Sequence, residues 1–75
     1  MSDTEWIEQR VEALAERAEC FFIPATCRYL AEIPGRHRVF LWAIGASPAE
    51  AKLALRDVLR GYFQRQLAAL AECSR

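Results

Sequence analysis

Side chains that could carry out chemistry are few and scattered along the chain. The only histidine, His37, lies between Arg36 and Arg38 in a predicted turn. A general base needs an orienting partner, and Glu32 is the only nearby acidic residue by cross-strand position. A solvated turn residue is the simpler interpretation of His37. No serine or cysteine has a base at a catalytic spacing, and no glycine-rich phosphate loop is present.

Three cysteines, Cys20, Cys27 and Cys73, could join His37 in a zinc site. Such a site would draw its ligands from four separate elements, whereas structural zinc sites usually use close pairs. No two cysteines are spaced as Cys-x-x-Cys, and their odd number is typical of free thiols in a reducing, cytoplasmic compartment. We therefore expect no metal, no other cofactor and no enzymatic activity.

The length and the charge of the chain limit what it can be. Its 75 residues allow one domain, residues 1–75, which buries only about 60% of its unfolded surface and gains from association. The net charge is zero, but residues 1–24 carry −4 and residues 25–75 carry +4. No basic leader and no apolar run of about 20 residues indicates secretion or a membrane span.

Basic residues form two groups that could bind a partner. The groups are Arg28, Arg36 and Arg38 on a predicted hairpin, and Lys52, Arg56 and Arg60 at every fourth position of a predicted helix. A nucleic-acid-binding module would use both groups, with Tyr29 or Trp42 stacking on bases. Alternatively, the helical group pairs with glutamates of the first helix or with a partner chain. Zero net charge favours this pairing, because domains that bind phosphate backbones are usually strongly basic.

The stretch over residues 38–50 organises the predicted fold. Its hydrophobic period changes from about 2 to about 3.6 residues, so a strand over 38–44 is followed by a helix. Ser47 suits the N-cap, Pro48 suits the first helical position, and Glu50 completes a capping box. We expect this helix to run from Pro48 to about Glu72.

A first helix is predicted to begin near Ser2, Asp3 or Thr4. It should end at Phe22 or Ile23, because Pro24 disfavours helical geometry in the residue before it. Its apolar stripe is Ile7, Val11, Leu14, Ala18 and Phe21, with glutamates along one flank. Residues 26–33 and 38–44 are predicted to pair as a hairpin around a turn at 34–37, which is either a tight Pro-Gly turn or a turn centred on Gly35-Arg36. The two registers differ by two residues and leave the same side chains on each face.

The predicted hairpin has two unequal faces. The core face is expected to carry Cys27, Tyr29, Ala31, Ile33, Phe40, Trp42 and Ile44. The second face is expected to carry Arg28, Leu30, Glu32, Val39, Leu41 and Ala43. This second face is half apolar, which a solvated hairpin does not need. The last helix has an apolar arc of about half its circumference, wider than the usual stripe of about 100°, so it should contact more than one element.

One resemblance to a known family follows from two segments. Residues 31–35 (AEIPG) and residues 45–52 (GASPAEAK), followed by an amphipathic helix, resemble the body of HicB-type antitoxins. That family shows a strand ending in Pro-Gly, a short strand, and a Gly-Asp-Thr-x-Glu-Glu-Ala-like cap, and its first strand lies where we expect the acidic helix. The resemblance covers residues 27–66 at most. A basic hairpin before an alanine-rich helix is also similar to the arm-binding domains of phage-type integrases.

These patterns predict an α+β domain in the order helix–strand–strand–helix, with both helices on the aromatic face of the hairpin. We expect a homodimer, or a larger partner, to cover Leu30, Val39 and Leu41. The glutamate flank of the first helix should lie beside Lys52, Arg56 and Arg60. The predicted function is a non-enzymatic protein-binding module of the antitoxin or inhibitor kind, encoded by a phage or mobile element. The alternative is a nucleic-acid-binding module that uses both basic groups.

Overall fold

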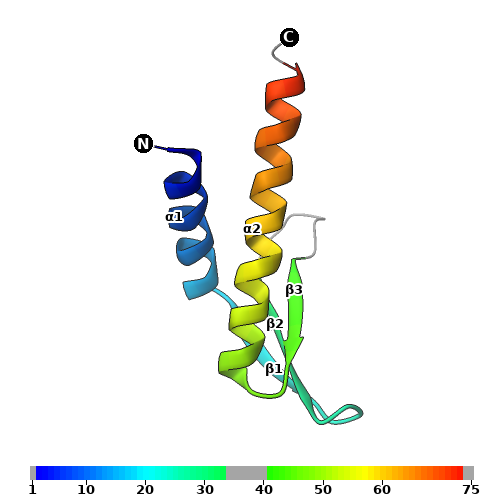
Figure 1. Ribbon diagram of the computed structural model, residues 1–75. Helices are drawn as coiled ribbons and strands as arrows, with labels where there is room; N and C mark the ends of the chain where they lie inside the picture. The colour runs from blue at the N-terminus through cyan, green and yellow to red at the C-terminus, as the bar shows by residue number, and fades with distance from the viewer. Residues whose placement is uncertain (1, 34–40, 74–75) are drawn as a thin grey trace.

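The computed structural model describes residues 2–33 and 41–73. It contains α1 (Asp3–Glu16), β1 (Glu19–Ile23), β2 (Arg28–Glu32), β3 (Trp42–Gly45) and α2 (Pro48–Cys73) (Figure 1). The strands form one antiparallel sheet in the order β1-β2-β3, α2 covers one face of that sheet, and α1 packs against α2. The predicted α+β class is confirmed, and β1 is a strand additional to the predicted order.

β1 occupies residues that were predicted to end the first helix. The apolar stripe of that helix continues in register to Phe21, but α1 ends at Glu16, with Arg17 as its C-cap. The residues that follow include two phenylalanines and a β-branched isoleucine, which suit a pleated, half-buried surface. β1 pairs with β2 along its whole length, so its backbone groups gain cross-strand partners. The predicted helix end at Phe22 or Ile23 is therefore wrong.

A tight turn joins β1 to β2. Pro24 follows Ile23, whose carbonyl accepts a hydrogen bond from the Thr26 amide at 3.2 Å. Proline suits this second position of a turn because its φ is preset. Cys27 then adopts a φ of 54°, which turns the chain back into β2 at Arg28. β2, which corresponds to the strand predicted over residues 26–33, therefore begins two residues later than predicted.

The register between β2 and β3 differs by an odd number of residues from both predicted ones, by three from a turn centred on Gly35-Arg36 and by five from a Pro-Gly turn. Ala31 lies opposite Ala43, and Glu32 lies opposite Trp42. Opposite residues of an antiparallel pair share a face, so any odd shift in register moves every side chain of one strand to the other face of its partner. The predicted core face is confirmed for Tyr29, Ala31 and Ile33 of the first hairpin strand. It is wrong for Trp42 and Ile44, which point away from α2. Val39, Phe40 and the turn predicted at 34–37 lie outside the described residues.

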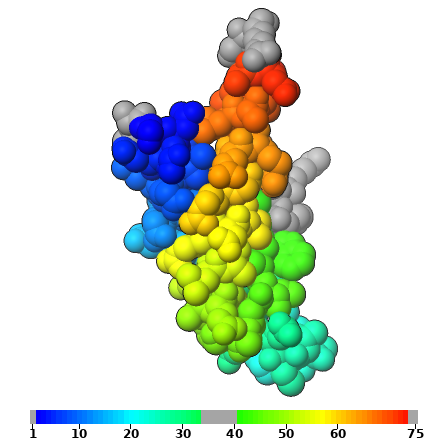
Figure 2. All heavy atoms as spheres, viewed as in Figure 1, coloured from blue at the N-terminus to red at the C-terminus, as the bar shows by residue number. Residues whose placement is uncertain are grey.

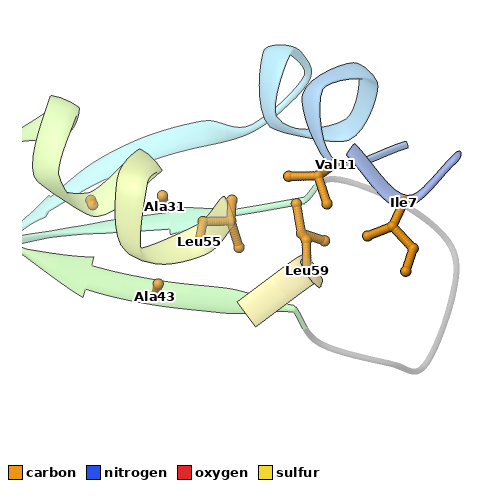
Figure 3. Close-up of a cluster of buried hydrophobic side chains, with 7 residues drawn as sticks. Ile7, Val11, Ala31, Ala43, Leu55 and Leu59 are labelled. Carbon is orange, nitrogen blue, oxygen red and sulfur yellow. The ribbon is translucent and has the colours of Figure 1, made fainter. Parts of the chain in front are cut away.

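The face that α2 covers is built from small residues. Ala31 is fully buried, and Ala43 is 6% exposed. At Gly45, an added Cβ would lie 2.7 Å from the Glu50 carbonyl carbon and 2.9 Å from the Ala51 Cα. Small side chains thus let α2 approach the sheet closely. The larger core side chains come from the helices: Val11, Leu55 and Leu59 are fully buried (Figure 3).

The predicted caps of both helices are present. Ser47 Oγ accepts a hydrogen bond from the Glu50 amide at 3.1 Å, and the Glu50 carboxylate accepts one from the Ala46 amide at 3.1 Å. This is the expected capping box, with its return bond one residue earlier than in the usual form. Ser2, one of three predicted candidates, caps α1 through a 3.2 Å bond from the Glu5 amide.

α2 makes the molecule long. The principal extents are 48, 24 and 18 Å, and the radius of gyration is 13.9 Å. A compact chain of this length would have a radius of gyration of about 11 Å. The last turns of α2 extend beyond α1 and beyond the sheet (Figures 1 and 2). Its wide apolar arc contacts both α1 and the sheet, as predicted, so this arc does not by itself require a partner chain.

Candidate protein-binding face

The sheet face that points away from α2 is apolar and exposed. We call it the open face, and its apolar members are Phe21, Ile23, Leu30, Trp42 and Ile44. Trp42 is 51% exposed, Phe21 46% and Ile44 39%. Within residues 2–33 and 41–73, neither helix covers this face. The two-layer fold therefore leaves large side chains in solvent while alanines line much of its core.

Cross-strand pairing arranges the open face in three rows. From one end to the other, the rows are Glu19–Glu32–Trp42, Phe21–Leu30–Ile44 and Ile23–Arg28. The middle row is entirely apolar, and Leu30 is half-buried between its two neighbours. One end row is acidic and the other is basic. The open face is therefore polarised along the strands.

The charged side chains of the end rows are available for a partner. Glu19 and Arg28 are exposed, and Glu32 is half-buried. In the part of the chain that the structure describes, the ion pairs lie on the helices and include none of these three residues. The acidic and basic ends lie four residues apart along β2, which is about 13 Å. That separation is too large for direct pairing within one sheet.

The helical basic group faces α1, as predicted. Arg56 Nε donates to Glu12 Oε1 at 2.9 Å. Arg60 Nε and Nη2 donate to the Glu8 carboxylate at 2.5 and 3.1 Å, and Arg60 Nη1 donates to Asp57 Oδ1 at 2.7 Å. The predicted meeting of the glutamate and basic flanks is confirmed for these pairs. Lys52 is half-buried and has no ion pair among the described residues.

Ionisation of the Glu8 carboxyl is coupled to Arg60. Hydrogen bonds from the Arg60 guanidinium lower the pKa of Glu8, and desolvation opposes this shift without reversing it. The Glu8 carboxylate in turn raises the pKa of Arg60. The charged form of each residue thus favours that of the other. Both Arg56 and Arg60 are occupied within the molecule and do not offer free guanidinium groups to a phosphate backbone.

The structure separates the other predicted site residues. Arg28 lies at the start of β2 on the open face, and Leu30 lies at its centre. Leu41 is half-buried in contact with the core, not on the face of Leu30 where it was predicted. The odd shift in register explains this correction. Arg36, Arg38 and Val39 fall outside the described residues.

Sequence reasoning missed four apolar members of the open face: Phe21, Ile23, Trp42 and Ile44. Phe21 and Ile23 were assigned to the first helix or its end, and Trp42 and Ile44 were assigned to the core side of the hairpin. One signal could have located Phe21, because the run from Cys20 to Ile23 is short, apolar and bounded by Pro24, a pattern typical of a strand. No local signal distinguishes the two faces of β3.

The described residues contain no organised disulfide or metal-binding site. Cys20 is half-buried, Cys27 and Cys73 are exposed, and the three thiols are not joined by disulfides. Among residues 2–33 and 41–73, no group of three histidine, cysteine or acidic side chains is placed to hold a metal ion. Neither of the helices described is long and apolar enough to cross a membrane.

Comparison with known proteins gives no relative from which a role could be transferred. The chain matches no protein-family model, no curated protein and no solved structure at a significant level.

Proposed function

We propose that the chain is a small, non-enzymatic protein-binding module that acts through the open face. The observation that carries this proposal is the exposure of Phe21, Trp42 and Ile44 on one contiguous face. Monomeric proteins rarely leave large apolar patches in water unless the patches bind something. Aromatic side chains are enriched at the centres of protein interfaces, where they contribute much of the binding energy.

Within that class, we propose a module of the antitoxin or inhibitor kind, encoded by a phage or mobile element and acting in the cytoplasm. The order of three strands followed by a capped helix supports the resemblance to HicB-type antitoxins. β1 supplies a strand before residues 27–66, where that family has its first strand. Three unpaired cysteines favour a reducing compartment.

Nucleic-acid binding receives less support from the arrangement of the basic residues. Arg56 and Arg60 already bind Glu12 and Glu8, so only Lys52 of the helical group has no ion pair among the described residues. Arg28 shares its sheet face with apolar side chains and two glutamates. Extended binding of phosphates requires several free cations on one surface.

The proposal is tested by replacing one open-face residue and one residue on the opposite side of the molecule. The protein that the immobilised chain captures from its host would be identified, purified and titrated against three chains by calorimetry. We expect Ile44→Asp to abolish binding of the purified partner. Leu53→Asp is the matched control, since Leu53 is 59% exposed on α2, and should bind like the parent chain.

Two outcomes would contradict the proposal. If both variants bind the purified partner like the parent, the open face is not the binding surface. If instead the chain binds duplex DNA at physiological salt, with a log–log salt slope of about −0.9 per phosphate, nucleic-acid binding replaces this proposal.

A further inference from the structure

We infer that the open face binds a second copy of this chain in a two-fold, face-to-face pair of sheets. The two-fold axis lies between the sheets, perpendicular to the strands, and passes over the row of Phe21, Leu30 and Ile44. This inference deepens the proposed function and rests on it, because it names the occupant of the same face. It follows from the way charge and bulk are distributed about Leu30.

The charges of the open face are complementary to themselves under this symmetry. Arg28 and Glu32 lie two residues before and two residues after Leu30 on β2. A two-fold axis over Leu30 and perpendicular to the strands places Arg28 of each copy over Glu32 of the other. Two identical ion pairs then form, one at each end of the interface. An isologous interface requires such self-complementarity.

The other two-fold arrangement of stacked sheets is disfavoured by the same charges. An axis parallel to the strands would place Arg28 over its own copy and Glu32 over its own copy. Like charges placed opposite one another at an interface suppress that mode of association. Charge complementarity therefore favours the stacking in which the β2 strands of the two copies run antiparallel over the one in which they run parallel.

The bulk of the side chains fits the same axis. On β3, Trp42 lies two residues before Ile44, and the position two residues after it is Ala46, which is exposed. The inferred symmetry places the Trp42 ring of one copy over the Ala46 end of the other, where a small side chain leaves space. Arg28 of that copy lies in the same end row, so the ring can also receive its guanidinium.

The size of the face limits the strength of the pair. Two strands of five residues and one of four, spaced about 4.8 Å apart and rising about 3.3 Å per residue, form a face of about 14 by 17 Å. Because side chains make each face uneven, two such faces together bury roughly 1,000 Å² of accessible surface, at the lower end for specific interfaces. We therefore expect a reversible dimer that forms at micromolar concentrations. A small, marginal core would gain stability from this association.

Complementary charge variants test the pair. Arg28→Glu gives a chain with two acidic ends, and Glu32→Arg gives a chain with two basic ends. In sedimentation experiments each variant alone should dimerise at least about tenfold more weakly than the parent. An equimolar mixture of the two should dimerise like the parent, because both ion pairs are restored in the heterodimer. This recovery also shows that both variants are folded.

Two further variants separate the open face from other surfaces. Leu30→Asp should abolish the dimer, and Leu53→Asp should leave it unchanged. A parent chain that stays monomeric at several hundred micromolar overturns the second-copy inference. That result does not decide the binding-module proposal, which is tested separately by whether Ile44→Asp loses the captured partner. A parent dimer that is insensitive to Arg28→Glu and Glu32→Arg also overturns the inferred symmetry.

Discussion

Two glycines show how one added methyl group can have opposite effects. The Cβ of an alanine at position 45 would collide with the backbone of Glu50 and Ala51, which cannot move without shifting α2. At Gly61 the nearest atom is the flexible end of Arg65, at 3.4 Å. Close backbone approach therefore requires glycine at position 45 but not at position 61.

Gly45→Ala should destabilise the chain, and Gly61→Ala should stabilise it. Overpacking of this kind typically costs about 1–3 kcal/mol. Alanine in a helix interior is more favourable than glycine by about 1 kcal/mol. Urea unfolding followed by circular dichroism measures both. Equal effects of the two substitutions would show that β3 and α2 are not in close contact.

The Glu8–Arg60 pair predicts a pH dependence of stability. The folded pKa of Glu8 lies below its ordinary value of 4.5, so its contribution is present above about pH 4.5. It is lost as the pH falls through the folded pKa, because Glu8 is then protonated in the folded chain as well as in the unfolded chain. The melting temperature of the parent should exceed that of Glu8→Gln at pH 7, and the difference should shrink below pH 4.5. A constant difference from pH 7 to pH 3 would contradict this assignment.

At the scale of elements, α1 is held to α2 by apolar and charged contacts along one seam. Trp6 packs edge-on against Phe63, with ring centroids 5.7 Å apart. Val11 and Leu59 are buried between the helices (Figure 3). The ion pairs of Arg56 and Arg60 lie beside this apolar contact. They determine which flanks of the helices meet and add little stability, because exposed pairs are weak.

Charge reversal on this seam should be repaired from the other helix. Arg56→Glu is expected to lower the melting temperature by roughly 4–8 °C, which corresponds to about 1 kcal/mol for a chain of this size. Adding Glu12→Arg should recover most of the loss, because the pair is restored with its sign exchanged. Arg65→Glu, at an exposed position without an ion pair among the described residues, is the control and should have a smaller effect. Failure of Glu12→Arg to compensate would exclude the contact.

Some features of the helices were predictable from the sequence because they depend on local chemistry. The cap at Ser47 and Glu50, the amphipathic course of α2 and the acidic flank of α1 all depend on neighbours within four residues. β1 was missed because the spacing of Ala18 and Phe21 extends a helical stripe that the preceding residues had already begun. Pairing with β2 stabilises the strand there, and pairing is not a local property.

The open face was missed for a related reason. Its members depend on whether Ala31 lies opposite Ala43, as in the structure, or opposite Phe40, as a turn centred on Gly35-Arg36 implies, and the two choices differ by three residues. Both choices place apolar side chains on both faces of the hairpin, so hydrophobic pattern alone does not distinguish them. What distinguishes them in the structure is size, because only Ala43 and Gly45 allow α2 to approach. That requirement becomes visible only once the helix is placed on the sheet.

At the scale of the whole molecule, the long α2 can report the symmetry of the inferred dimer. Gly45 lies against Ala51, and α2 rises about 33 Å from there to Cys73. α2 runs alongside β3 (Figure 1). An axis perpendicular to the strands and close to Gly45 therefore sends the two ends of α2 in opposite directions.

Spin labels on Cys73, in a chain with Cys20→Ser and Cys27→Ser, should give an inter-label distance of about 60 Å. An axis parallel to the strands would place both labels at the same end of the dimer. Only the stacked sheets would then separate the two α2 helices, so the labels would lie a few tens of ångströms apart. Dilution with excess unlabelled chain should remove the dipolar signal in either case. A short distance would contradict the inferred axis.

The packing of α1 against α2 has a consequence for the nascent chain. Synthesis proceeds from the N-terminus, so α1 is made first and α2 last. β1 and β2 are joined by a short turn and can pair as soon as both have left the ribosome. The stripe of Ile7 and Val11 finds no partner until the residues around Leu59 and Phe63 have been translated. Of the described elements, α1 is thus translated first but covered last, so it stays accessible to proteases and chaperones for longest.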